Sequence, residues 1–177
     1  MGKLKIPFVE KSTIYLLLLI LSAVGCKSAK NESDRRNFVG DIIANEELDD
    51  ATFNICGSEK EVFQYFNTGK GISIDREKKA LDTKLFKLFK DNTFRDNGYV
   101  RIRFIVNCQG ESGRFRVLTS DLQFNEIKMS ASTTEPLLKA CKDIKGWKPL
   151  IYDEKPRDYY QYLTFKIVDG KIKEILP

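Results

Sequence analysis

The chain has 177 residues, of which 42% are hydrophobic and 31% are charged, a balance that is ordinary for one folded domain with a short appendage. Its net charge of +5 comes from basic and acidic residues that are mixed along the chain, which argues against nucleic acid as a partner. Histidine is absent, which excludes Ser-His-Asp and Cys-His catalysis and every His-ligated metal site. No other nucleophile motif is present, so we expect no enzyme, no metal and no cofactor.

Residues 1–25 have the layout of a bacterial lipoprotein signal peptide. A lysine-containing start precedes an apolar run over residues 14–24. As a helix this run would measure roughly 17 Å, well short of the ~30 Å hydrocarbon core of a bilayer, which favours a cleavable segment. Residues 23–26 read Ala-Val-Gly-Cys and resemble a lipobox, although the usual leucine is Ala23. We therefore predict that Cys26 is lipidated after cleavage.

A lipidated Cys26 implies a protein of the cell envelope, anchored to the outer membrane and facing the periplasm. Two alternatives are simple secretion with a free Cys26 and an uncleaved membrane anchor. Residues 26–52 are polar and charged, so we expect a flexible tether that holds the domain away from the bilayer.

Two helices are expected within residues 53–96. Ser58 and Glu61 have the spacing of a capping box, which predicts a short helix that ends near Gly69. A second helix is expected over residues 76–90, because its apolar residues repeat at helical spacing. Its apolar stripe consists of Leu81, Leu85, Leu88 and Phe89.

The pattern then changes to the alternation of a strand. From Tyr99 to Cys108 apolar residues occupy every second position, with Ile105 on the outer side. Residues 109–113 predict a hairpin loop, and residues 114–119 the returning strand. A helix should begin near Thr133 and end at Gly146, and its buried stripe is Leu137, Cys141 and Ile144.

Another strand is expected over residues 159–168, with Tyr160 and Tyr162 on its outer side. Asp169-Gly170 is a strong hairpin signal, so residues 171–176 should form a short closing strand. The fold class predicted for residues 97–177 is α+β: an antiparallel sheet built from a β-hairpin, a helix, a strand and the closing strand. Helices lie on one face, and the two N-terminal helices precede the sheet.

Several motifs between residues 97 and 168 resemble the C-terminal domain of TonB. The motifs are Gly98–Asn107 on the first strand, Gly110, Gly113 and Phe115–Val117 on the hairpin, Leu137, Leu138 and Cys141 on the helix, Gly146-Trp147-Lys148-Pro149 after it, and Lys155–Arg157 and Tyr162–Phe165 on the last strand. The resemblance implies that Trp147 and Pro149 serve the fold. Asp153-Glu154 departs from the family, which usually has a glycine there.

The resemblance also implies how a partner is bound. TonB domains receive a peptide segment of an outer-membrane transporter as an added strand at an open sheet edge. Tyr160 and Tyr162 would contact such a partner, unless the closing strand already covers that edge. TonB proteins carry an uncleaved membrane helix and a Pro-rich stalk, whereas this chain has a lipobox and no such stalk, which is similar to small envelope lipoproteins of Bacteroidota. We therefore expect a protein- or peptide-binding module, and a TonB-type energy transducer is the alternative.

The cysteines predict one disulfide. Once Cys26 is lipidated, three cysteines remain in an oxidising compartment. Cys141 suits a helix stripe as a small buried hydrophobe, whereas Cys56 and Cys108 lie at the ends of elements, where the backbone can adjust to a bridge. We predict the Cys56–Cys108 bond, and the rival pairing is Cys108 with Cys141.

Overall fold

The computed structural model of the chain describes residues 40–64, 74 and 77–176. Within these residues the fold is α+β, as predicted, with two α-helices, a five-stranded mixed sheet and a separate two-stranded hairpin. Neither of these helices is long and apolar enough to cross a membrane.

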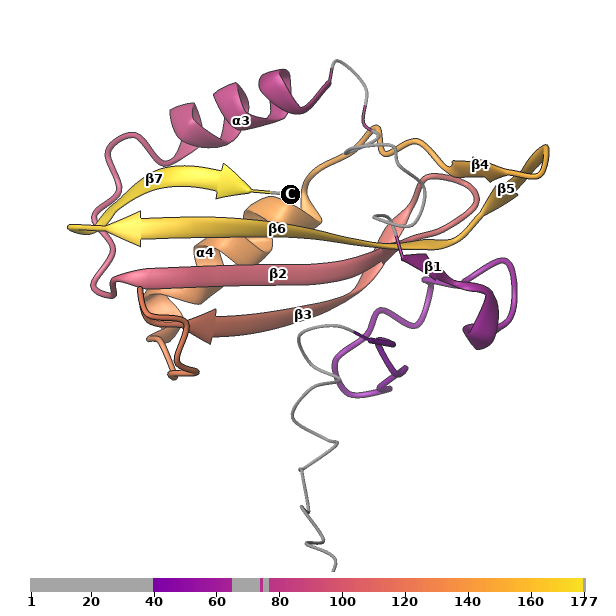
Figure 1. Cartoon of the computed structure of the whole chain (residues 1–177), viewed down its shortest axis with the longest axis horizontal. Helices are drawn as coiled ribbons and strands as arrows, with labels where there is room; N and C mark the ends of the chain where they lie inside the picture. Colours follow the sequence, from indigo (N-terminus) through magenta and orange to yellow (C-terminus); the bar gives the residue numbers. More distant parts are fainter. Residues whose placement is uncertain (1–39, 65–73, 75–76, 177) are drawn as a thin grey trace, which may run out of the picture. The chain divides into compact units, whose positions relative to one another are not determined.

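Figure 1 shows the sheet, whose strands follow the order β1, β6, β2, β3, with β7 also paired to β6. The sheet is mixed because β1 runs parallel to β6, whereas we predicted a purely antiparallel sheet. Strands β4 and β5 form the separate hairpin. The strands are β1 (Phe63–Gln64), β2 (Gly98–Val106), β3 (Ser112–Ser120), β4 (Leu150–Tyr152), β5 (Lys155–Arg157), β6 (Tyr159–Val168) and β7 (Lys171–Leu176).

The main core lies between the sheet and the two helices, on what we call the inner face. Alternate residues of the central strands β2 and β6 point into it and are fully buried, because the side chains of a strand alternate between its faces. These residues are Val100, Ile102, Phe104, Leu163, Phe165 and Ile167. The strand pattern in the sequence therefore assigned the inner face correctly.

Helix α4 (Ala131–Lys142) covers this face, where Leu137 and Cys141 are buried. Its N-cap is Ser130, slightly before the predicted start. Asp96 binds this end of the helix, because its carboxylate accepts hydrogen bonds from the hydroxyls of Ser130 and Thr133. The predicted C-cap at Gly146 is wrong: the helix ends at Lys142, and a tight turn follows in which Ile144 N–H donates to the Cys141 carbonyl.

Helix α3 (Glu77–Leu88) confirms the second N-terminal helix. Leu81, Leu85 and, just beyond its end, Phe89 enter the core, but Leu88 is exposed, so the predicted stripe is narrower than we expected. The first predicted helix is wrong where the structure describes it. The capping box of Ser58 and Glu61 is present, but it begins only a single 3-10 turn, Glu59–Glu61.

After that turn the chain becomes extended at Val62 and pairs as β1 with β6. Tertiary contacts outweigh the local helix signal here: Val62 is buried, and the ring of Phe63 lies 4.8 Å from that of Tyr152. The rest of the predicted helix, toward Gly69, lies outside the described residues.

Candidate functional site

Residues 40–62, the N-terminal arm, cross the outer face of the sheet, which is the face opposite α4. Ile42 and Val62 of the arm form a second buried apolar cluster with Ile105 and Tyr160 of the sheet. The ring of Phe53 occupies the space above Gly113, where an added Cβ atom would lie only 2.1 Å from the ring. Apolar contacts thus seat the arm on one end of the outer face.

Three arginines of the sheet bind the arm. Arg116 donates two hydrogen bonds to the carboxylate of Asp49 and one to the Ile43 carbonyl. Arg114 forms a two-pronged ion pair with Glu59, at 2.7 and 2.8 Å. These hydrogen bonds lower the pKa of both carboxyl groups. Arg103 is buried and donates to the Gly40 carbonyl.

These contacts contradict two predictions, one on the extent of the flexible tether and one on the exposure of Tyr160. Residues 40–52, which we expected in the flexible tether, pack against the sheet; residues 26–39 and Cys26 lie outside the described part. Tyr160, expected on an exposed surface, is only 2% exposed because the arm covers it, and its hydroxyl lies 3.3 Å from an Asp41 carboxylate oxygen. The pKa of Tyr160 is raised to about 12, mainly because the side chain is buried.

Tyr162 is half-buried beneath the guanidinium of Arg101, whose Cζ lies 5.1 Å from the ring centre. Tyr160 and Tyr162 therefore do not form the exposed aromatic pair that we expected. The edge of β6 is also occupied: β7 pairs with Thr164–Val168, and β1 pairs with Tyr159 and Tyr160. The alternative in which the closing strand covers this edge is the arrangement found.

A disulfide joins the arm to the sheet. The sulfur atoms of Cys56 and Cys108 are bonded, and their Cα atoms are 5.9 Å apart, which is the pairing that the sequence predicted. Cys141, the rival partner of Cys108, is a buried free thiol whose pKa is raised by burial.

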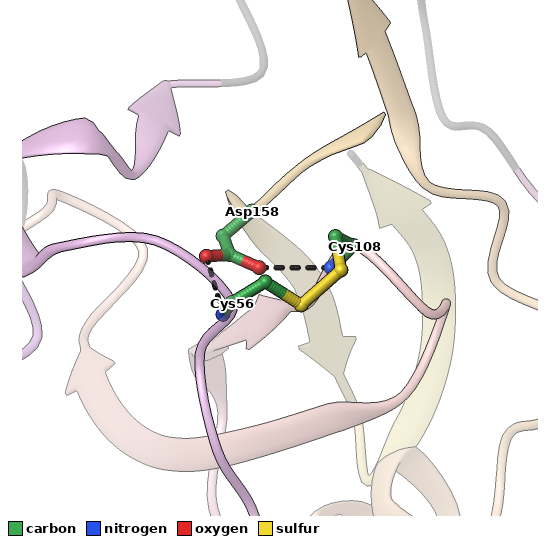
Figure 2. Close-up of side chains that lie close together, drawn as sticks. All are labelled: Cys56, Cys108 and Asp158. Carbon is green, nitrogen blue, oxygen red and sulfur yellow. Dashed lines mark hydrogen bonds between the residues drawn. A yellow bond between two sulfur atoms is a disulfide. The ribbon is translucent and has the colours of Figure 1, made fainter. Parts of the chain in front are cut away.

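Asp158 organises this junction (Figure 2). Its carboxylate accepts hydrogen bonds from the main-chain N–H groups of Cys56, Gly57 and Cys108, each at 2.8 Å. The side chain therefore binds both cysteines through their backbones while being only 3% exposed. Nothing in the sequence pattern had indicated a role for Asp158, because its three donors come from two distant loops.

Cys56, Cys108 and Asp158 also form the group of potential metal ligands in the described part of the chain, with ligand atoms within 4.8 Å of one another. The two sulfurs are engaged in the disulfide, and both carboxylate oxygens accept backbone hydrogen bonds. Because cysteine binds a metal as a thiolate, the disulfide leaves Asp158 as the one remaining ligand of this group, and we interpret the oxidised group as a structural junction.

Trp147 is buried at 4% exposure beyond the end of α4, where its ring lies 5.2 Å from that of Phe104. Its carbonyl approaches Gly110 so closely that a Cβ atom there would lie 2.3 Å away. Pro149 is half-buried beside the same glycine. The Trp-Lys-Pro segment thus packs against the β2–β3 hairpin loop, in keeping with the structural role that the resemblance implies.

Strand β3 has a partly free edge. Within the part of the chain that the structure describes, β3 pairs with β2 on one side, and on the other side its end pairs with the following loop through a bridge between Ser120 and Glu126. A groove of about 570 Å³ follows this edge. Its walls include Ile43 and Leu48 from the arm and Leu138 and Lys142 from α4.

In comparisons with known proteins, no family model, no curated protein and no solved structure matches this chain.

Proposed function

We propose that this protein is a lipid-anchored, non-enzymatic binding module of the cell envelope that receives an extended peptide segment at the free edge of β3. The observation that carries the proposal is the groove along the outer edge of β3, beside Val117. The resemblance to TonB domains suggested the same mode of binding at β6, but β7 and β1 pair with that strand.

The orientation of the β3 backbone can be read at its end, outside the groove. There Ile127 N–H donates to the Thr119 carbonyl from the side opposite β2, at 3.2 Å, so the main-chain groups of Thr119 point away from β2. Because main-chain groups two residues apart point to the same side of a strand, Val117 also directs its N–H and carbonyl away from β2. An extended peptide beside Val117 would satisfy both groups, as in other cases of strand addition.

The walls of the groove supply apolar contact on both sides of such a peptide. Ile43 and Leu48 are large apolar side chains that are exposed on the arm. Leu138 is half-buried on α4 and packs against the edge of the core. Since successive side chains of a strand point to opposite faces, alternate residues of the peptide would contact the arm and the helix. This geometry suits a peptide with apolar residues.

Crosslinking in cells tests strand addition. A photoreactive amino acid at Leu48 should capture a protein partner, whereas the same group at Leu88, exposed on α3, should not. Val117→Pro should abolish capture, because proline removes the outward N–H that a peptide would use. Val117→Thr, which keeps that N–H, is the matched control. Capture that persists in a folded Val117→Pro variant would refute binding at this edge.

The lipid anchor has its own test. Metabolic labelling with a fatty-acid analogue should tag the wild-type protein but not Cys26→Ala, and the mature N-terminus should be Cys26. An intact N-terminus that begins at Met1 would overturn this part of the proposal and favour the energy-transducer alternative, which needs an uncleaved membrane anchor.

A further inference from the structure

We propose a second binding site on the outer face of the sheet, where Arg101 holds the carboxylate of a small ligand that also carries an apolar group. A pocket of about 270 Å³ lies there, beyond the part of the face that the arm covers. It shares Leu118 with the groove along β3, and no other lining residue is common to the two. This inference does not depend on strand addition at β3.

The floor of the pocket is one row of side chains that runs across four strands. Arg101 of β2 lies opposite Leu118 of β3 and Thr164 of β6, and Thr164 lies opposite Leu176 of β7. Cross-strand neighbours on one face are close enough for a single small molecule to touch them. The row thus places a cation and a hydroxyl between two apolar side chains.

Arg101 is held in position for a ligand. Its guanidinium lies over the ring of Tyr162, and its Nε atom is 3.4 Å from the Thr164 hydroxyl. The three arginines that bind the arm already have partners there, whereas Arg101 has no ion pair among the described residues. None of the residues that line the pocket is acidic. A carboxylate would supply the missing negative charge and match the planar fork of the guanidinium.

An aromatic wall closes one side of the pocket. The rings of Tyr99 and Phe124 are stacked, with centroids 4.7 Å apart and planes 12° from parallel. Phe124 is 72% exposed and has a left-handed backbone with φ of 66°, which is costly for a bulky residue. Asp121 holds this loop, because its carboxylate accepts hydrogen bonds from the N–H groups of Gln123 and Asn125. The loop thus presents an aromatic ring to solvent at the pocket instead of burying it.

The size and chemistry of the pocket define the ligand class. Its volume lies just below the ~300–1,000 Å³ of sites for drug-sized ligands, so it suits a single aryl or short alkyl group joined to a carboxylate. A free organic acid and the C-terminal residue of a peptide share this chemistry. The two sources are distinguished by the probes.

The test is a nuclear magnetic resonance titration of the folded protein with four probes. These are 3-phenylpropanoate and its uncharged amide, and a tetrapeptide that ends in phenylalanine, as free acid and as amide. We expect at least one acid to shift the amide signals of Arg101 and Thr164 and to bind roughly tenfold or more tightly than its amide. The acid that binds more tightly identifies the source. Equal affinities for acid and amide, or no shift with either acid, would overturn the proposal.

Variants assign the effect to Arg101. Arg101→Gln should weaken binding of the acid to the level of the amide, and Arg101→Lys should have an intermediate effect, because it keeps the charge but loses the fork. Lys84→Gln, on the exposed surface of α3, removes the same charge and should change nothing. Phe124→Ala, at an exposed position, should lower the affinity without unfolding the domain. Unchanged affinity in both folded variants, Arg101→Gln and Phe124→Ala, would refute the site.

Discussion

Arg116 of β3 donates hydrogen bonds of 2.5 and 2.9 Å to the carboxylate of Asp49, which lies 67 residues earlier in the chain. Both side chains are largely shielded from solvent, at 22% and 11% exposure. A shielded pair with two hydrogen bonds contributes more than an ion pair on the open surface. The arm is therefore fixed to the sheet by electrostatics as well as by its disulfide.

Asp49→Asn should loosen the arm. We expect a loss of about 1–3 kcal/mol in the free energy of unfolding, because hydrogen bonds to a charged group are replaced by weaker ones. Cleavage after Glu46 and Glu47 by a glutamate-specific protease should become faster. Asp91→Asn, at an exposed position elsewhere, should leave both measurements unchanged. A cleavage rate equal to that of the wild type would contradict the role of this pair.

Replacing both Cys56 and Cys108 with alanine should destabilise the protein. The two cysteines are separated by 52 positions in the sequence. A loop of that length corresponds to about 4 kcal/mol in the chain-entropy estimate. Urea denaturation measures the loss, and a reducing agent should destabilise the wild type but not the double variant. If reduction destabilised both proteins equally, the Cys56–Cys108 bond would not be the source of the lost stability.

Trp147→Ala should cost ~3–5 kcal/mol in the free energy of unfolding, because it removes a large buried ring that packs against Phe104. Tyr152→Ala, an aromatic truncation at an exposed position, should cost much less. Denaturant unfolding of the two variants compares them directly. If the loss at Trp147 were under about 1 kcal/mol, the ring would contribute little to the core, and Trp147 would become a candidate contact residue.

Asp96 should make stability depend on pH under acidic conditions. Hydrogen bonds from the side chains of Ser130 and Thr133 lower the pKa of Asp96 below its ordinary value of 3.8. The unfolded state therefore binds the proton first, so the contribution of Asp96 is present above that value and is lost as the pH falls through the lower folded pKa.

The comparison of wild type and Asp96→Asn tests this linkage. The difference in their free energy of unfolding should be constant near neutral pH and should shrink as the pH falls below about 4. A difference between wild type and Asp96→Asn that stays constant down to about pH 2 would rule out the proposed linkage.

The antiparallel strands of the sheet could be predicted from the sequence because they combine alternation with clear turns. Asp169 and Gly170 adopt φ values of 51° and 68°, as their hairpin signal implies, and β6 has the predicted bounds. The capping box at Ser58 led to the wrong prediction of a helix, because local spacing carries no information on the pairing of Phe63 with Tyr159. Tyr160 was placed on the correct face, but alternation cannot show that a distant segment covers that face.

The same limit explains which residues of the sites could be predicted from the sequence and which could not. Cys56 and Cys108 could be paired because few cysteines were available, whereas Asp158 binds them only through backbone groups, which every residue type offers. The row of Leu118, Arg101, Thr164 and Leu176 depends on the register of four strands. A one-residue shift in any strand would move its member of the row to the inner face.

The central position of β6 also has a consequence for folding. Strand β2 has β6 as a neighbour, with Val100 opposite Phe165, although helix α4 and the β4–β5 hairpin lie between them in the sequence. Such pairing between distant segments raises the contact order, and the sheet closes only after the segment that contains β6 has been synthesised. Until then β2 has one bare edge, which is prone to aggregation, so the nascent chain should benefit from a chaperone that shields this strand.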